Sequence, residues 1–408
     1  MKCPSMSDLR LLLGPVSLFV LAALSFLLAA GAAEARPQNL QDLAAINKRL
    51  TETGTSLGAI PSLYRPRYDR VQDAALTMSP DDIVFVVLLP DGPRLYPQRI
   101  MVWHQVVNEV VDDMAFAITY SPTTGSLMAY DATLNGMNLI FDVDGRLYDG
   151  NSVLIDRTTN SLWLQELGIA FDGQLLGRGL PMLPVFWTSW EAARRVYPQA
   201  PVLAQPPGKR PYGRDPYGDY RRKDSYYHND RLAWPVQHLD KRFHRKTNML
   251  CLEYGDLLLA IDVEYVKQKG VVNFFLGSSA LLATHDPQLD VVRVFSRHIW
   301  AEPFLFVLQD GRLMDLTTRS IWDPASGKAL EGNMQGATMQ QFFGCHSMWF
   351  AWYSIHPETF TVPGPGDVPA HLLSLSPPGE DMPAAPASPI PPLPAASGLP
   401  ALPGQAIQ

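Results

Sequence analysis

The sequence predicts a predominantly antiparallel β protein of the α+β class, with two pseudo-equivalent tandem repeats packed as one globular body and only short helices. Three observations lead to this prediction. Short apolar runs are separated by turn residues, with Asp-Gly and Thr-Gly pairs at the turns. One long segment matches a later segment without a gap. Two aromatic-rich runs, around 187–198 and 348–357, have the length of short helices.

The composition and the first residues indicate the class of protein and its cellular location. The chain has 408 residues, 47% of them hydrophobic, and a formal net charge of -7, which gives no general attraction to nucleic acid. Residues 1–35 indicate an export signal, because a long apolar run ends in the small-x-small site Ala33-Glu34-Ala35. The run exceeds the roughly 7–15 residues of an ordinary signal core, so an uncleaved membrane anchor is the alternative. We therefore expect a periplasmic or otherwise extracytoplasmic protein, or one anchored in the inner membrane.

The chain then runs through an approach segment and a first repeat. Residues 36–78 are expected to be a polar approach with a short helical stretch. The first repeat, 79–205, opens with a strand, a Pro-Asp-Gly turn and a second extended piece. Residues 98–111 are expected to form a short helix that runs into a strand. Further short strands follow, as in an antiparallel meander, and a helix stopped by Pro198 closes the repeat.

A basic, tyrosine-rich connection and a second repeat come next. Residues 206–247 hold eleven Lys and Arg against five Asp, a net charge of +6, which in an exported protein favours a surface connection docked by its tyrosines over nucleic-acid binding. The second repeat, 248–362, is expected to use strands at 257–266 and 271–277 and a closing helix. The Pro/Ala-rich tail, 363–408, cannot bury enough apolar surface to offset the entropy lost on ordering, so we expect it to be disordered.

An internal match supports the duplication. Residues 158–204 superpose on 317–363 at a fixed offset of 159 positions. Identical residues in this match include two tryptophans, three glycines and a proline: Trp163, Gly168, Gly173, Gly177, Trp190 and Pro198, matching Trp322, Gly327, Gly332, Gly336, Trp349 and Pro357. A second match upstream has an offset of 165 and pairs Val106-Val107-Asn108 with Val271-Val272-Asn273. We expect a site in the cleft between two such halves.

Several motifs resemble a known family. Tyr96-Pro97 stands before Trp103-His104 and Val107-Asn108, and Asp156-Arg157 stands before Ser161-Leu162-Trp163 and Gln165. Together with YGRDPYGDY, DKRFHRK and MWFAWYSIHPET, these motifs are similar to those of a bacterial and archaeal family known only as domain of unknown function 3179, over roughly residues 58–362. The resemblance implies an extracytoplasmic address for many members and no established activity.

The chain departs from that family at one loop. Members commonly carry Cys-Pro-x-Cys-Gly-Thr where this chain has Ser121-Pro122-Thr123-Thr124-Gly125-Ser126. Two cysteines at that spacing suit a soft metal or a redox dithiol, whereas a hydroxyl is a poor metal ligand and forms no disulfide. If relatives use these cysteines chemically, this chain has lost the chemistry or kept only binding.

The same regions supply the candidate site. His104 and Asn108 are four residues apart and share a helical face, and His104 has the chemistry of a ligand or general base. His285 corresponds to Tyr120 in the alignment of the halves, so His104, Ser121 and His285 are expected to converge if the halves face each other. The candidate ligand-binding residues are His104, Asn108, Tyr120, Ser121, Thr124, Asp156, Arg157, Trp163 and His285. We expect no metal ligand among them and name no cofactor.

Alternatives stay open for several of these residues. Trp163 and its counterpart fit core positions as well as ligand contacts, and Asp156-Arg157 fits an ion pair at a strand end. A hydrolase with Ser121, His104 and either Asp113 or Asp131 is possible by residue type, although the chain has no Gly-x-Ser-x-Gly elbow. Cys251 and Cys345 fit either a disulfide or two buried thiols.

These patterns favour an exported protein that binds a small ligand or an envelope partner in the cleft between two repeats. An enzyme, metal-dependent or hydrolytic, with its site around His104 and the loop Tyr120–Ser126 is the first alternative. An envelope scaffold whose tail acts as a spacer is the second. The sequence leaves open whether any reaction is catalysed.

Overall fold

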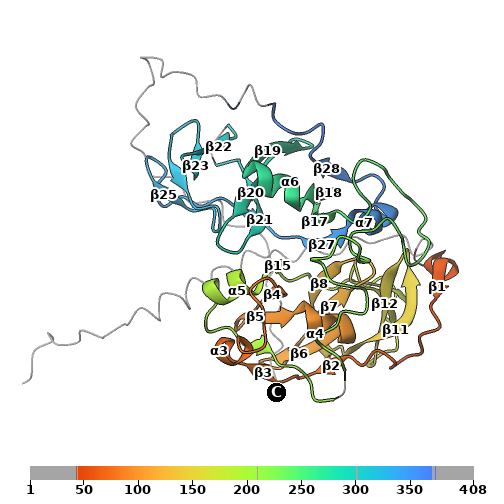
Figure 1. Ribbon diagram of the computed structural model, residues 1–408. Coiled ribbons are helices and arrows are strands. Elements are labelled where there is room, and N and C mark those ends of the chain that lie inside the picture. The colour runs from red at the N-terminus through yellow and green to blue at the C-terminus, as the bar shows by residue number, and fades with distance from the viewer. Residues whose placement is uncertain (1–42, 44, 209, 300–301, 370–372, 374–408) are drawn as a thin grey trace, which may run out of the picture. The chain divides into compact units, whose positions relative to one another are not determined.

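The computed structural model describes residues 43, 45–208, 210–299, 302–369 and 373, and strands are its main regular element (Figure 1). It is β-rich, with antiparallel and mixed sheets and five short α-helices, α3 to α7. The signal or anchor expected at 1–35 lies outside the described residues, as does most of the tail expected at 363–408. None of the helices within the described ranges is long and apolar enough to cross a bilayer.

Short elements lead into the first half, which we define as residues 83–203. The lead-in contains η1 (Asn47–Arg49), β1 (Leu50–Glu52), β2 (Leu63–Tyr64), β3 (Tyr68–Asp69) and α3 (Val71–Ala74). The first half contains β4 (Ile83–Leu89), β5 (Gly92–Pro97), α4 (Gln98–His104), β6 (Val106–Val111), β7 (Met114–Ser121), β8 (Ser126–Asp131), β9 (Thr133–Leu134), β10 (Met137–Asn138), β11 (Phe141–Tyr148), β12 (Asn151–Asp156), β13 (Leu162–Leu164), β14 (Ile169–Asp172), β15 (Val185–Ser189), α5 (Trp190–Val196) and β16 (Val202–Leu203).

The second half, residues 248–362, follows the connection 206–247. It contains β17 (Asn248–Tyr254), β18 (Leu257–Asp262), α6 (Val263–Lys269), β19 (Val271–Leu276), β20 (Ser279–Asp286), β21 (Val291–Ser296), β22 (Phe306–Gln309), β23 (Arg312–Asp315), β24 (Ile321–Trp322), β25 (Ala329–Glu331), β26 (Gln341–Phe342), β27 (Cys345–Met348), α7 (Trp349–Ile355) and β28 (Phe360–Val362).

The helix α6 corrects one sequence expectation. A single strand was expected over 257–266, but the strand β18 ends at Asp262 and a helix begins. Asp262 is the N-cap: its carboxylate accepts from the amides of Glu264 at 3.0 Å and Tyr265 at 3.2 Å. Gly270, with a φ of 75°, then ends the helix. The apolar run hid this boundary because strand and helix bury neighbouring parts of it.

Strands from both halves share one eight-stranded sheet, in the order β2-β6-β7-β8-β27-β17-β18-β28 (Figure 1). The junction is the pairing of β8 with β27, where Leu127 lies opposite His346 in antiparallel register. At this place the halves are joined by hydrogen-bonded strands rather than separated by the cleft we expected. The core on one side of the sheet accordingly mixes residues of both halves, such as Met128, Trp163, Met249 and Trp349.

One asparagine in each half connects two strands through the same pair of side-chain to backbone hydrogen bonds. Asn108 in β6 donates to the carbonyl oxygen of Phe141 at 3.0 Å and accepts from its amide at 2.8 Å. Asn273 in β19 makes the same two bonds with Phe306, at 2.7 and 2.9 Å. Buried amide side chains that bond backbone groups across a gap in a sheet serve as structural bridges.

A buried carboxylate and a tryptophan are paired in each half as well. The indole N–H of Trp163 donates to Asp156 at 2.9 Å, and that of Trp322 donates to Asp315 at 2.9 Å. Both indoles are 1% exposed and lie in the core. Such a pair satisfies the only polar atom of a buried tryptophan.

Two further segments settle details of the expected organisation. Cys251 and Cys345 lie opposite each other on β17 and β27 as free, buried thiols, and burial raises the pKa of Cys251. Disorder was expected from residue 363, but residues 363–369 are described and ordered against the body: Val368 donates its amide to the carbonyl oxygen of Asn273 in β19.

Candidate functional site

The loop Tyr120–Ser126 closes the hairpin between β7 and β8. Ser121 lies opposite Ser126 in antiparallel register, and Gly125 takes the positive φ of 64° that closes the turn. The side chains of Ser121, Thr124 and Ser126 are all fully buried. Buried hydroxyls need hydrogen-bond partners, so the residues around the loop decide what it does.

Amides and hydroxyls form a continuous network beneath this loop. Thr124 Oγ1 accepts from Asn151 Nδ2 at 3.0 Å and from Ser126 Oγ at 2.9 Å. Asn151 Nδ2 also donates to Gln165 Oε1 at 2.8 Å, and Gln165 Nε2 donates to Thr119 Oγ1 at 2.9 Å. The hydroxyl of Thr124 therefore has its hydrogen-bonding capacity used within the protein.

Tyrosines of the connection cover the same loop. The Tyr226 hydroxyl donates to the carbonyl oxygen of Thr123 at 2.6 Å, and the hydroxyls of Tyr220 and Tyr120 lie 3.0 Å apart. The ring of Tyr220 stacks on Tyr227 with centroids 3.6 Å apart. These contacts match the expectation that the connection docks through its tyrosines. They also cover the loop Tyr120–Ser126.

Lys246 fixes the turn that carries these tyrosines. Its ammonium donates to the carbonyl oxygen of Arg231 at 2.6 Å, to Asn229 Oδ1 at 3.2 Å and to the carbonyl oxygen of Tyr226. It also lies 3.5 Å from the centroid of the Tyr226 ring. Burial lowers the pKa of Lys246 to about 8, yet all three of its donors are used.

Glu166 is the one carboxylate buried against this network without an evident partner. It is 2% exposed, and neither carboxylate oxygen forms a hydrogen bond of ordinary geometry with a described residue. Burial raises its pKa from 4.5 to about 7, although the nearby hydroxyls of Ser347 and Ser126 act to lower it. These two serines are 3.1 Å apart and belong to β27 and β8, so Glu166 lies at the junction of the halves.

His104 is held in one neutral form. Its Nδ1 lies 2.7 Å from the carbonyl oxygen of Pro61, which can only accept, so Nδ1 carries the proton. Nε2 then accepts from the Tyr212 hydroxyl at 2.7 Å. Burial lowers the pKa of His104, which favours this neutral form. Both ring nitrogens are engaged, as in a structural histidine.

The predicted hydrolytic triad is not assembled. Ser121 Oγ lies 3.1 Å from Ser152 Oγ and accepts from the Ser152 amide at 3.3 Å, and no described hydrogen bond links it to a histidine. Asp131 accepts a hydrogen bond from the Thr133 amide at 2.8 Å, whereas His104 bonds to Pro61 and Tyr212. A nucleophile and its base must be within hydrogen-bond reach, and these are bonded elsewhere.

The pair Asp156-Arg157 is likewise split. Asp156 accepts from the Thr159 hydroxyl at 2.8 Å and from Trp163, whereas Arg157 pairs with Asp142 on the neighbouring strand β11. The ion pair expected between Asp156 and Arg157 is therefore wrong, because consecutive strand residues point to opposite faces of the sheet.

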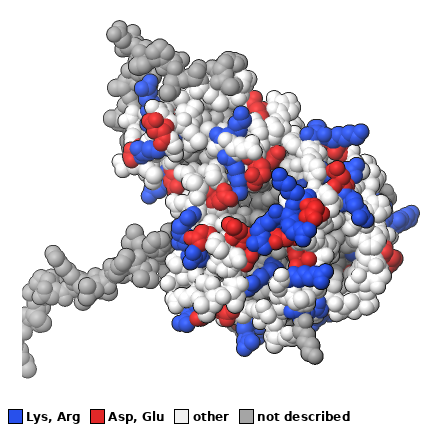
Figure 2. All heavy atoms as spheres, in the orientation of Figure 1, with Lys and Arg blue, Asp and Glu red and all other residues white. Residues whose placement is uncertain are grey.

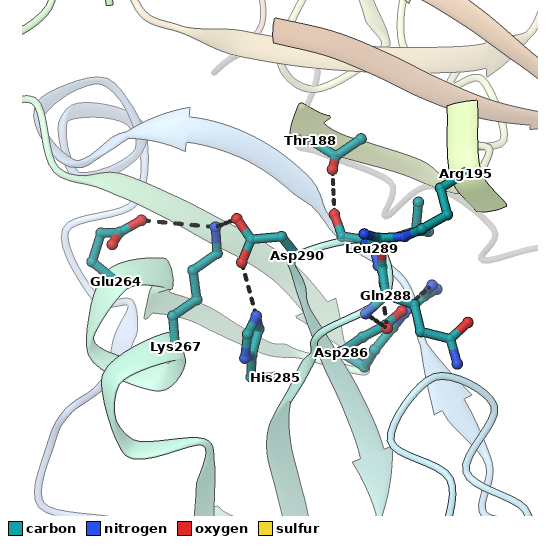
Figure 3. A network of polar contacts seen from close by, with 10 residues as sticks. Thr188, Arg195, Glu264, Lys267, His285, Asp286, Gln288, Leu289 and Asp290 are labelled. Atoms are coloured by element: carbon teal, nitrogen blue, oxygen red, sulfur yellow. Dashed lines mark hydrogen bonds and ion pairs between the residues drawn. The ribbon is translucent and has the colours of Figure 1, made fainter. Parts of the chain in front are cut away.

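His285 lies in a separate network on the second half (Figure 3). Its Nε2 is 2.8 Å from the Asp290 carboxylate. The same carboxylate accepts a hydrogen bond from the Lys267 ammonium at 2.8 Å. No described hydrogen bond joins His285 to His104 or Ser121. Among the described residues no group of three or more His, Cys, Asp or Glu side chains is placed to hold a metal ion.

A hollow of about 840 Å³ lies instead between the connection and the start of the first half, lined by residues of 77–83, 98–99 and 212–226. It contains several charges of each sign: Arg99, Arg214, Arg221 and Arg222 with Asp81, Asp82, Asp215, Asp219 and Asp224. Arg221 pairs with Asp219 at 2.6 Å. Figure 2 shows the same mixture of signs over the visible face, where neither dominates.

Ser225 is the most telling residue of this hollow. It is 8% exposed, and its hydroxyl has no hydrogen-bond partner among the described residues. Tyr217 and Tyr226 are also among the residues that line the hollow. A buried hydroxyl without a partner calls for an explanation, such as a water or ligand that supplies the missing hydrogen bond.

Sequence reasoning missed several of these residues. Asn151, Glu166 and Ser225 were not among the candidates, and Gln165 was noted only within a motif. The signal for Glu166 was a lone acid in the apolar run LWLQELGIAF. For Ser225 the sequence carries no comparable signal, because its burial depends on the fold of the whole connection.

Comparison with known proteins gives one match. The family described as "Protein of unknown function (DUF3179)" matches residues 58–359. No curated protein matches the chain, and no solved structure does.

Proposed function

Since this chain belongs to the DUF3179 family, whose description assigns no activity, we propose from its own geometry that it is an exported binding protein. The export signal that we expect at residues 1–35 supports a periplasmic or other extracytoplasmic location, and an inner-membrane anchor is the alternative. The loop Tyr120–Ser126, where the resemblance implies cysteines, is buried, covered by tyrosines and has its hydroxyls hydrogen-bonded, which favours binding over chemistry at that loop.

The ligand site in this proposal is the hollow of about 840 Å³ beneath the connection rather than a cleft between the halves. The observation that carries it is Ser225, whose buried hydroxyl lacks a partner within the described part of the chain. The volume falls within the roughly 300–1,000 Å³ of known small-molecule sites.

A neutral, hydroxyl-rich ligand of the sugar type fits the lining best. Guanidinium and carboxylate groups are nearly balanced, so the hollow offers donors and acceptors without selecting a net charge. Tyr217 and Tyr226 are among the lining residues, and in this proposal an aromatic ring of the lining contacts the apolar side of a sugar ring.

The two halves are, in this proposal, pseudo-equivalent copies of one β unit. The bounds of α4 and α6 differ by 165 residues at both ends, and those of α5 and α7 by 159. The repeated Asn–Phe and Asp–Trp contacts support the same reading. Two copies with the same arrangement of helices and strands can differ in one loop, so the loop that is buried in the first half can differ in the second.

An enzyme is the second candidate, favoured by one observation. Glu166 is buried, its carboxylate has only the hydroxyls of Ser347 and Ser126 nearby, and its pKa is raised to about 7, which is the range of a general acid or base at neutral pH. Its reaction would require the tyrosine cover to open. The envelope scaffold stays a third proposal, and most of the tail that would act as its spacer lies outside the described residues.

A titration with neutral disaccharides tests the proposed function. Maltose, cellobiose and chitobiose are titrated into the full chain, and binding is followed by calorimetry and by saturation-transfer NMR. We expect one of them to bind, and Arg222→Ala or Ser225→Ala to weaken it about tenfold or more. Lys223→Ala is the matched control, because Lys223 is adjacent but does not line the hollow. Equal affinity in Arg222→Ala, Ser225→Ala and wild type, or no binding of any disaccharide, contradicts the proposal.

A further inference from the structure

A second, smaller pocket of about 350 Å³ lies on the second half. Its walls are the turn after β20, the hairpin between β22 and β23, and the strand β24 with the residues that follow it. This volume is at the lower end of the roughly 300–1,000 Å³ of small-ligand sites. No residue of this pocket lines the hollow beneath the connection, so the two are independent.

The inside of this pocket is apolar. Leu313 and Trp322 line it and are each 1% exposed, which places them at its base. Leu308 and Leu330 also line it and are 45% and 48% exposed, so they border its opening. Large aliphatic side chains that are half in water gain free energy when a ligand covers them, at about 25 cal/mol per Å².

The polar groups of the lining differ in how much of their bonding capacity is used. The Asp286 carboxylate is 1% exposed and accepts from Arg293 at 2.9 Å and from the Gln288 amide at 2.9 Å. The Asp323 carboxylate accepts from the Ala325 amide at 3.1 Å and from a serine hydroxyl. Both acids are therefore satisfied within the protein and do not select a cation.

Arg312 is the charged donor left at the opening. Its guanidinium pairs with Glu331, which does not line the pocket, and the two side chains are 48% and 60% exposed. Exposed pairs of this kind are worth little because water and salt screen them. Arg312 can therefore turn part of its five-donor fork toward an anion in the pocket.

The wall formed by the turn after β20 is held by contacts with both halves (Figure 3). Asp290 receives Lys267 at 2.8 Å and His285 at 2.8 Å. Arg195 of α5 donates to the carbonyl oxygen of Gln288 at 2.8 Å, and Thr188 of β15 donates to that of Leu289. A wall held from two sides keeps the pocket formed without a ligand, which lowers the cost of binding.

This place corresponds to the buried loop of the first half. His285 is 165 residues after Tyr120, and Trp322 is 159 residues after Trp163. In the first half, tyrosines of the connection cover the corresponding loop, as Tyr226 does through its bond to Thr123. In the second half the corresponding place is the apolar pocket.

We infer that the second-half pocket binds a small amphipathic monoanion, with its apolar chain on Leu308, Leu330 and Trp322 and its carboxylate at Arg312. The ligand class follows from an apolar interior, satisfied acids and one available guanidinium. This site goes beyond the proposed sugar site and shares no residue with it.

Calorimetry with three ten-carbon probes tests the inference. Decanoate, decanol and decyltrimethylammonium are titrated into the full chain below their micellar concentrations. We expect one decanoate per chain, with decanol weaker by about tenfold or more and the cation not bound, because only the carboxylate accepts a charge-assisted hydrogen bond from Arg312. The Arg312→Ala variant should bind decanoate about as weakly as wild type binds decanol, and Leu330→Glu should not bind it.

Two matched controls keep the result specific. Arg157→Ala removes an arginine that is also exposed and ion-paired, and Leu239→Glu changes a leucine with the same 48% exposure as Leu330. Both should bind decanoate like wild type, and circular dichroism should show all variants folded. Absence of decanoate binding, equal binding of decanol, or equal losses in the control variants would overturn the inference. The disaccharide titration reports on the other site, so either proposal can fail alone.

Discussion

Replacing Glu166 with glutamine should change the pH dependence of stability in a defined direction. The carboxyl has a pKa of about 7 in the folded chain against an ordinary value of 4.5, because burial disfavours its charge. A raised pKa contributes stability that is complete below pH 4.5 and is lost as the pH rises to 7. At about 1.4 kcal/mol for each pH unit, the ionised form costs the wild type about 3 kcal/mol at pH 8.

Glutamine has nearly the same shape and cannot ionise. Whatever Glu166→Gln does at pH 4.5, where wild-type Glu166 is mostly protonated in the folded chain, its free energy of unfolding relative to wild type should be about 3 kcal/mol higher at pH 8. Urea unfolding of both proteins at the two pH values measures this difference. The contribution of Glu109, whose pKa is also raised, cancels because both proteins contain it.

A control and a contradicting result complete this test. Glu191→Gln removes a half-exposed carboxylate that pairs with Arg194 in α5, and its effect should change by less than about 1 kcal/mol between the two pH values. If the difference between Glu166→Gln and wild type is the same at pH 4.5 and pH 8, Glu166 is ionised and compensated in the folded chain, and the reasoning is refuted.

Three other changes have expected outcomes. Asp156→Ala and Asp315→Ala should each lower the free energy of unfolding by about 3 kcal/mol, since each leaves a buried indole N–H unpaired. Urea unfolding measures both losses, and a loss of stability in only one of the two variants would contradict the prediction. Tyr226→Phe should cost about 1 kcal/mol and speed hydrogen exchange of the loop Tyr120–Ser126, whereas unchanged exchange would mean that the tyrosine does not hold the loop. Lys246→Met leaves three acceptors without their donor and should make 226–231 sensitive to limited proteolysis, in contrast to Lys223→Met, which changes an exposed residue.

Local patterns predicted the elements well, and long-range contacts explain the differences. The helix and strand over 98–111 followed from apolar spacing, which depends only on neighbouring residues. The helix α6 was missed because its N-cap, Asp262, stands inside one continuous apolar run. The roles of Glu166 and Ser225 were out of reach, because their burial arises from segments far apart in the chain.

The predicted site shows the same division. His104, Asn108 and Trp163 were chosen as residues of unusual type and spacing, and each is engaged in bonds within the fold. A motif of polar residues reports on buried bridges as readily as on ligands, because both need defined donors and acceptors. What distinguishes them is an unpartnered group beside open space, which only the folded chain reveals.

Hydrogen exchange with and without the best-binding neutral disaccharide tests the central claim most directly. The claim predicts added protection of amides in 77–83 and 212–226, which line the hollow, with no change in the buried loop at 120–126. Protection centred on 120–126, with 212–226 made more exchangeable, would mean that the tyrosine cover opens over a site at that loop, and would contradict the claim.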